Sequence, residues 1–127
     1  MNSPDPLISP LEIGGVRILN NLVLAPMAGV ADGPFRRICA QLGAGLTVSE
    51  LVSARGLLNE NGPTHDLISF TGQPRPYAVQ IFGSDPATMA EAARRVEAMG
   101  VCDMIDINMG CPVAKVVKTG AGAALMR

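Results

Sequence analysis

Four short apolar runs, separated by segments of helical periodicity, constrain the fold of this chain more than any other feature. The runs lie at residues 22–25, 46–50, 76–83 and 103–108. Short strands that alternate with helices pair in parallel in one sheet and are joined by right-handed crossovers. We therefore expect an α/β protein built on a parallel sheet. The run at 22–25 carries no polar residue, so we expect it to be buried on both faces.

Two of the connecting segments carry clear helix signals. Asp85 is a good N-cap with Pro86 as the first helical residue, and Gly100 ends that helix. In the segment 34–42, apolar residues recur at i, i+3, i+4 and i+7. This pattern predicts a buried stripe of Phe35, Ile38, Cys39 and Leu42. The segment around His65 lacks such a pattern, so we expect an irregular region with a solvated or capping histidine.

A different pattern precedes the first strand. Residues 1–20 comprise a proline-containing leader and two alternating runs, at 11–13 and 16–18, that flank Gly14-Gly15. A two-residue glycine turn between alternating runs predicts a β-hairpin. We expect this hairpin to close one end of a larger fold, whose strand–helix units occupy residues 21–127.

Each predicted strand ends in residues that do not continue an apolar ladder. These residues are Pro26 and Met27, Glu50, Gln80 and Asn108. Functional residues at the C-terminal ends of parallel strands are typical of a β/α barrel. The G-x-G-x-x-G turn of a dinucleotide-binding sheet is missing after the first strand. A full barrel needs about 250 residues, so the sequence predicts the N-terminal half of a TIM-type (β/α)8 barrel with a preceding hairpin.

The last predicted strand leads into the residue types best suited to chemistry. Asp106 and Asn108 share one face of it, and Cys111 follows on the turn Met109-Gly110-Cys111-Pro112. The thiol could serve as a nucleophile, as a metal ligand or as an acid beside a cofactor. A metal site is set aside because the chain has no C-x-x-C pair and only one histidine. We expect Asp106 to be a buried, hydrogen-bonded structural carboxylate.

Composition excludes several classes of protein. Hydrophobic residues make up 48% and charged residues 17% of the chain, which is typical of a globular protein rather than a disordered one. The formal net charge of −1 does not fit a chain that is basic throughout, although Lys115, Lys118 and Arg127 follow the cysteine turn. Because we find neither a membrane-spanning run nor a signal peptide, we expect no membrane partner and a cytoplasmic location.

Three segments taken together carry a more specific signature. They are Leu24-Ala25-Pro26-Met27-Ala28-Gly29-Val30, Val79-Gln80-Ile81-Phe82-Gly83 and Asp106-Ile107-Asn108-Met109-Gly110-Cys111-Pro112. In order and spacing they resemble the signatures of the tRNA-dihydrouridine synthases, and most closely those of the bacterial B-type branch. The similarity runs from about residue 11 to residue 127. It therefore implies the N-terminal part of such an enzyme, without the second half of the barrel and the C-terminal tRNA-binding helical domain.

The resemblance implies a flavin cofactor. Members of the family bind FMN at the mouth of a β/α barrel and use NADPH to reduce it. In this chain the backbone of Pro26, Met27 and Ala28 would then lie against the isoalloxazine ring. The side-chain amide of Gln80 would hydrogen-bond the pyrimidine edge of the same ring.

The implied reaction is the reduction of a tRNA uridine to 5,6-dihydrouridine. Hydride added at C6 of uracil leaves a carbanion at C5, which needs a proton from the opposite face. Cys111 would donate that proton as general acid, since a thiol is largely protonated at neutral pH. Asn108 would hold the uracil, donating to and accepting from its edge, once the base is flipped out of the tRNA.

Two alternatives stay open. A small-molecule flavin reductase of the dihydroorotate-dehydrogenase type would share the first signature and Gln80, but the turn at 109–112 favours the tRNA enzyme. The other alternative is a truncated half-barrel without activity, because 127 residues are too few for the whole enzyme. Such a half-barrel would expose two strand edges and an apolar face.

Overall fold

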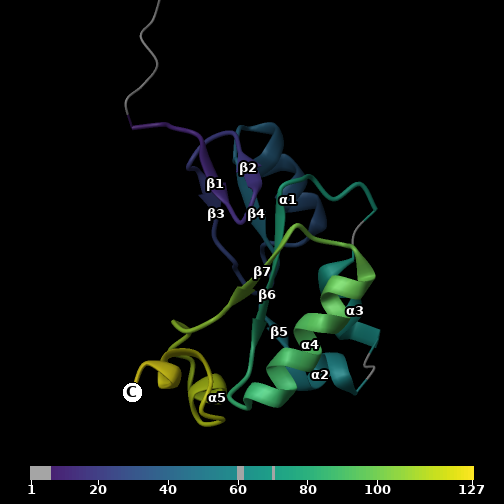
Figure 1. Cartoon of the computed structure of the whole chain (residues 1–127), viewed down its shortest axis with the longest axis vertical. Coiled ribbons are helices and arrows are strands. Elements are labelled where there is room, and N and C mark those ends of the chain that lie inside the picture. Colours follow the sequence, from purple (N-terminus) through teal and green to yellow (C-terminus); the bar gives the residue numbers. More distant parts are fainter. Residues whose placement is uncertain (1–6, 60–61, 70) are drawn as a thin grey trace, which may run out of the picture.

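A parallel sheet forms the centre of the computed structural model, which describes residues 7–59, 62–69 and 71–127 (Figure 1). Its strands are β3 (Val23–Leu24), β4 (Leu46–Val48), β5 (Val52–Ser53), β6 (Tyr77–Phe82) and β7 (Met104–Ile107). β3 pairs with β4, and β6 lies between β4 and β5 on one side and β7 on the other. β4 and β5 pair with successive parts of the same side of β6, so together they occupy one position in the sheet. Across the sheet the order is therefore β3, then β4 with β5, then β6, then β7, which is the order along the chain.

Helices cover one face of this sheet, as Figure 1 shows for the helices beside β6. They are α1 (Gly33–Gln41), α2 (Ala54–Leu58), α3 (Gly62–Ile68) and α4 (Pro86–Met99). Alternate residues of β6, namely Tyr77, Val79 and Ile81, form a buried cluster with Leu57 of α2 and Val96 of α4. The two-residue period of the strand therefore supplies the main hydrophobic core.

The predicted β-hairpin is present, and it lies on the other face of the sheet. β1 (Leu11–Ile13) pairs antiparallel with β2 (Val16–Ile18). Gly14 and Gly15 make the turn with φ of 55° and 82°, which a glycine adopts without strain. Ile18 is fully buried and packs with Leu46, Val48 and Ala78. The hairpin thereby closes one end of the sheet's second face.

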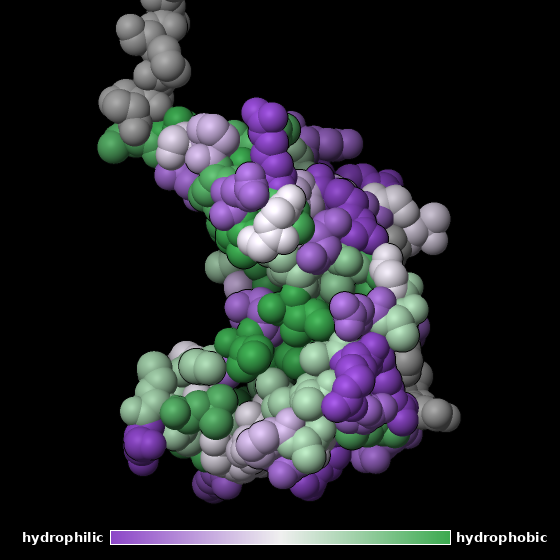
Figure 2. All heavy atoms as spheres, in the orientation of Figure 1, coloured by the Kyte–Doolittle hydropathy of each residue, from purple (hydrophilic) through white to green (hydrophobic). Residues whose placement is uncertain are grey.

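The rest of that second face is open. A concavity of about 370 Å³ is lined by residues of β1, β3, β4, β6 and β7, among them Val23, Pro26, Val48, Ala78 and Asp106. Figure 2 shows hydrophobic side chains gathered in a hollow of the surface. The hairpin bounds this hollow on one side; α5 (Ala114–Val117) and the 3-10 helix η1 (Gly122–Met126) bound it on the other.

The apolar run at 22–25 is not buried on both faces, contrary to expectation. Leu22 is 48% exposed and Val23 is 50% exposed. β3 pairs only with β4, so it forms an edge of the sheet that no other described strand covers. Apolar composition alone indicated the strand but not its position in the sheet.

The predicted buried stripe of α1 is also wrong. Ile38 and Leu42 are exposed, whereas Arg36 is 1% exposed. The guanidinium of Arg36 donates to the carbonyl of Ala31 and to the side chain of Gln73, and it lies 5.0 Å from the centre of the Tyr77 ring. These polar and cation–π contacts make burial of the charged residue favourable and rotate the apolar stripe outward.

The region around His65 is helical rather than irregular, because it belongs to α3. The helix contributes Ile68 to the main core. The side chain of His65 lies outside the described residues, as do residues 1–6 of the leader. The prediction of a solvated or capping histidine therefore stays a prediction.

Helix α4 follows the prediction closely. The Asp85 side chain accepts from the Thr88 N–H, and Gly100 ends the helix in the left-handed conformation at φ 62°. Ala92 and Val96 are buried, while Glu91 pairs with Arg95 across one turn at 3.6 Å. This helix is the best-specified local element of the chain, since every signal for it lies within a few residues.

Replacing Asp85 by Ala should lower the melting temperature by about 5 °C, because the N-terminus of α4 loses its acceptor. Asp85→Asn keeps an acceptor and should cost less. Hydrogen bonds from Thr88 hold the pKa of the Asp85 carboxyl below its ordinary value. The carboxylate therefore adds stability above its unfolded pKa, and this is lost as the pH falls through the folded pKa. Thermal melts from neutral to acidic pH should show this loss of stability in the wild type but not in Asp85→Asn. Identical pH profiles of the melting temperature for the two proteins would contradict a stabilising role of the Asp85 carboxylate.

Candidate active site

The side chain of Gln80 is the centre of the candidate active site. It lies on β6 and is 6% exposed. Its Nε2 donates to Oδ2 of Asp106 at 2.6 Å, and its Oε1 accepts from Nδ2 of Asn108 at 3.1 Å. These contacts follow from the sheet register, which places Gln80 opposite Asp106, and from the two-residue period that puts Asn108 on the same face. The sequence predicted these residues at neighbouring strand ends, and the structure brings them into direct contact.

Asn108 connects this amide to the cysteine turn. Its Oδ1 accepts from the backbone N–H of Cys111 at 3.0 Å and from that of Gly110 at 3.3 Å. An asparagine side chain that bonds the backbone two and three residues ahead replaces the lost strand ladder and makes a turn. The thiol of Cys111 is thereby held just beyond the end of β7, where it is half-buried.

Helix η1 supports the same turn from the other side. The carbonyl of Cys111 accepts from the N–H of Ala123 at 3.0 Å. Gly122 is required for this close approach, since a Cβ there would lie 2.6 Å from that carbonyl oxygen and its φ is 61°. A larger residue at this position would push the cysteine turn out of place.

The remaining hydrogen-bonding capacity defines what the two amides can bind. Both lone pairs of the Asn108 side-chain oxygen are taken by the turn, so this amide retains one free N–H. Gln80 retains one N–H and one lone pair. The expected role of Asn108 toward a uracil therefore narrows to donation, while Gln80 can both donate and accept.

The segment that follows β3 lies beside this network. Pro26 lines the open concavity together with Asp106. The carbonyl of Met27 accepts from the N–H groups of Val30 and Ala31, at 3.0 and 2.8 Å, which makes a tight turn. Met27 and Ala28 are exposed on that turn. The structure thus places Pro26 in the lining of the same concavity as Asp106, and Met27 and Ala28 on the exposed turn that follows.

Two residues after β4 have contacts that sequence reasoning missed. Ser49 Oγ accepts from the backbone N–H of Gln80 at 2.9 Å and donates to the carbonyl of Glu50 at 2.7 Å. The carboxylate of Glu50 accepts from the N–H of Gly29 and so holds the turn after β3. The position of Glu50 at a strand end was a visible signal, but its partner depends on how β3 lies beside β4.

The exposure of Asp106 differs from the prediction. It is hydrogen-bonded, as predicted, but it is exposed rather than buried. The reason is that β7 forms the second edge of the described sheet and carries Asp106 on its open face. The carboxylate therefore orients the Gln80 amide at the margin of the concavity.

The cysteines are free thiols, and each is half-buried. Burial raises the pKa of Cys102, which packs against the main core away from the turn. Within the described ranges, no cluster of three or more His, Cys, Asp or Glu could hold a metal ion. None of the helices in the same ranges is long and apolar enough to cross a membrane.

Replacing Asn108 by Ala should speed alkylation of Cys111 by iodoacetamide several-fold, because the turn loses both bonds to the Asn108 side-chain oxygen. Asn108→Asp loses the bond to Gln80 but keeps an acceptor for the Cys111 N–H, so it should not show the increase expected for Asn108→Ala. Peptide mass spectrometry reports each thiol separately. Cys102 should react slowly in all three proteins, because its raised pKa leaves little thiolate. An unchanged Cys111 rate in Asn108→Ala would contradict the proposed restraint.

Comparison with known proteins places this site in a family context. A family model described as dihydrouridine synthase matches residues 23–127. The chain is 47% identical over 120 residues to tRNA-dihydrouridine synthase B of Pseudomonas aeruginosa and 46% identical over 117 residues to the Vibrio cholerae protein of that name. It is 42% identical over 121 residues to a probable tRNA-dihydrouridine synthase of Treponema pallidum.

These alignments are unequal in the share of each protein that they cover. They include 94%, 92% and 95% of this chain, respectively, but 36% of each relative. The chain thus spans about a third of the length of these curated relatives. The family match takes in Gln80, Asn108 and Cys111 together with the strands that carry them. The chain belongs to the dihydrouridine synthase family.

Proposed function

We propose that the protein containing this chain reduces uridine in tRNA to 5,6-dihydrouridine, with FMN as its flavin and NADPH as reductant. The relatives described above are named as tRNA-dihydrouridine synthases, which supports the substrate class. One geometric observation carries the proposal for this chain. The side chain of Asn108 is hydrogen-bonded both to Gln80 and to the backbone of Cys111. The residues proposed to bind the flavin, to hold the uracil and to donate the proton are therefore joined by hydrogen bonds.

We also propose that the sheet is the N-terminal half of a (β/α)8 barrel. Its strands lie in chain order, and the described part of the sheet has no reversal of the kind found at the switch point of a doubly wound fold. The candidate site lies toward the C-terminal ends of β6 and β7, where barrel enzymes carry their chemistry. The exposed edge of β3 is the surface that a further strand would cover.

The residues assigned to FMN fit such a ring. Pro26 lines the apolar concavity together with Asp106, the hydrogen-bond partner of Gln80, so the backbone after β3 and the Gln80 amide lie near one another. The free N–H and lone pair of Gln80 match the alternating donors and acceptors of a flavin pyrimidine edge. We assign the holding of the ring to the backbone of Pro26, Met27 and Ala28 and to the Gln80 side chain.

When bound, FMN would supply the hydride that adds to C6 of the uracil, after its own reduction by NADPH. Asn108 would donate its remaining N–H to a uracil carbonyl and thereby orient the base. Cys111 would transfer the thiol proton to C5 and regain a proton from solvent. The bond from Asn108 to the backbone of Cys111 keeps the thiol at a constant position relative to the base. Asp106 is assigned no proton transfer, because its carboxylate is bonded to Gln80.

Replacing Cys111 by Ala should reduce dihydrouridine formation by about 10²–10⁴-fold, the usual contribution of a general acid. Reduction of the flavin by NADPH should continue at the wild-type rate, since the variant loses only the proton donor for C5. Nucleoside mass spectrometry of unmodified tRNA incubated with the complete gene product measures the first quantity, and anaerobic bleaching of the flavin absorbance measures the second. Cys39→Ala on α1 is the matched control and should retain full activity.

Retained dihydrouridine formation by the Cys111→Ala variant would refute the acid role. Flavin reduction coupled to a small pyrimidine but not to tRNA would instead favour a reductase of the dihydroorotate-dehydrogenase type. We further propose that residues 1–127 alone are inactive, because they span only about a third of the length of the curated relatives. Stoichiometric FMN and turnover in that isolated chain would overturn this part of the proposal.

A further inference from the structure

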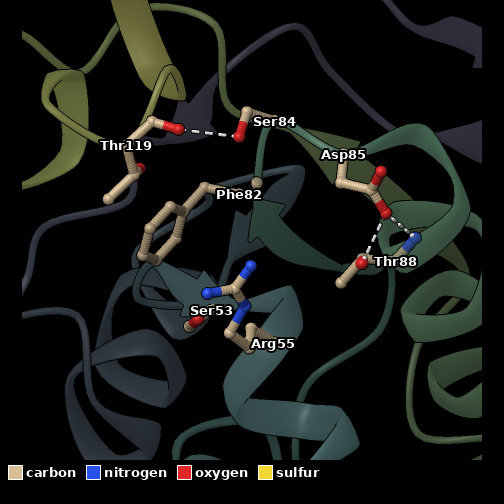
Figure 3. Close-up of a pocket in the computed structure, with 8 residues that line it drawn as sticks. Ser53, Arg55, Phe82, Ser84, Asp85, Thr88 and Thr119 are labelled. Atoms are coloured by element: carbon tan, nitrogen blue, oxygen red, sulfur yellow. Dashed lines mark hydrogen bonds between the residues drawn. The ribbon is translucent and has the colours of Figure 1, made fainter.

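A second cavity lies beside the candidate active site, at the C-terminal ends of β5 and β6 (Figure 3). Its volume is about 350 Å³. The lining residues come from β5, α2, the β6–α4 connection and the loop after α5: Ser53, Arg55, Phe82, Gly83, Ser84, Asp85, Thr88 and Thr119. The cavity thus combines a cation, an aromatic ring and several hydroxyl groups.

Arg55 supplies the positive charge among the lining residues of this cavity. Its side chain rises from α2 toward the space between Phe82 and Asp85 (Figure 3). Within the part of the chain that the structure describes, the Arg55 side chain makes no hydrogen bond or ion pair. Oδ2 of Asp85 is already committed to the N–H and hydroxyl of Thr88, at 2.7 and 2.6 Å. Besides these Thr88 hydrogen bonds, the charge of Arg55 acts on the Asp85 carboxyl and helps to lower its pKa, but the guanidinium N–H groups remain available to an anion in the cavity and bind phosphate oxygens well.

The charge balance indicates which anion fits. Arg55 contributes one positive charge and Asp85 one negative charge, so the cavity has no excess charge to neutralise a terminal phosphate dianion. A phosphodiester carries a single negative charge and can bind the guanidinium while keeping its distance from the carboxylate. Phe82 supplies an aromatic surface on which a base can stack. The combination suits one nucleotide within an RNA strand.

The position of Phe82 relates this cavity to the candidate active site. It follows Gln80 by two residues on β6, so the two side chains point to the same face about 6–7 Å apart along the strand. The hydroxyl of Ser84 donates to the carbonyl of Thr119 at 2.7 Å and joins the cavity wall to the segment that leads into η1. Helix η1 holds the carbonyl of Cys111. A single RNA strand could therefore reach both places with neighbouring nucleotides.

We propose that the cavity binds a nucleotide flanking the target uridine, with its base against Phe82 and its phosphodiester at Arg55. The proposal rests on the tRNA substrate proposed above. It adds a subsite outside the group of Gln80, Asn108 and Cys111, and this subsite would act in substrate binding rather than in the chemical step.

Fluorescence anisotropy with a transcribed tRNA, which contains no dihydrouridine, tests this subsite in the complete gene product. Arg55→Ala should weaken binding about tenfold at near-physiological salt and reduce the salt slope of log K by about one. Phe82→Leu should also weaken binding about tenfold, with an unchanged salt slope, because it removes stacking and no charge. Arg94→Ala is the matched control: this arginine is exposed on α4 and pairs with Glu91, and its loss should change binding less than twofold.

The subsite would be refuted if Arg55→Ala and Phe82→Leu bound tRNA with the same affinity as the Arg94→Ala control. Thermal melts check that each variant is folded. If Arg55→Ala does not fold, Arg55→Gln replaces it, and its tRNA affinity is compared with that of the same control. Dihydrouridine formation by the wild type is measured in parallel. Its absence would refute the proposed reaction, whereas its presence together with unchanged binding by the Arg55 and Phe82 variants would refute the subsite alone.

Discussion

The rest of the site depends on the side-chain amide of Gln80. A buried amide without partners would cost about 1–3 kcal/mol, and here its bonds to Asp106 and Asn108 satisfy both polar atoms. Asn108 in turn holds the backbone of Cys111. All of these contacts require one register between β6 and β7, since a shift by one residue would turn Asp106 and Asn108 toward the helices.

The fold keeps this polar network away from the main hydrophobic core. Alternate residues of β6 face α2, α3 and α4 and supply the apolar contacts, while Gln80 lies on the opposite face and bonds Asp106 and Asn108. The hairpin closes one end of that face through Ile18, and the concavity beside it is lined by Ile13, Ala78 and residues of β7. The polar network lies farther along, toward the C-terminal ends of β6 and β7. The Arg55 cavity lies beside these ends, which places a proposed RNA contact next to the proposed chemistry.

Features that depend on a few neighbouring residues could be predicted from the sequence. The glycine hairpin, the caps of α4 and the turn at Cys111 are of this kind. The outward face of α1 could not be predicted, because burial of Arg36 depends on Gln73 and Tyr77, which lie far along the chain. In the site, the two-residue period placed Gln80 and Asn108 at strand ends, but their mutual bond requires the register between two strands that sequence alone does not specify.

The proposed function requires that this chain contributes to a flavin site that reduces uridine in tRNA. A single-turnover measurement tests it most directly: the complete gene product is reduced with NADPH without oxygen, freed of excess reductant, and mixed with unmodified tRNA. The flavin absorbance should return, and one dihydrouridine should form for each flavin reoxidised. A flavin that stays reduced in the presence of tRNA, or a protein that binds no flavin, would contradict the proposed function.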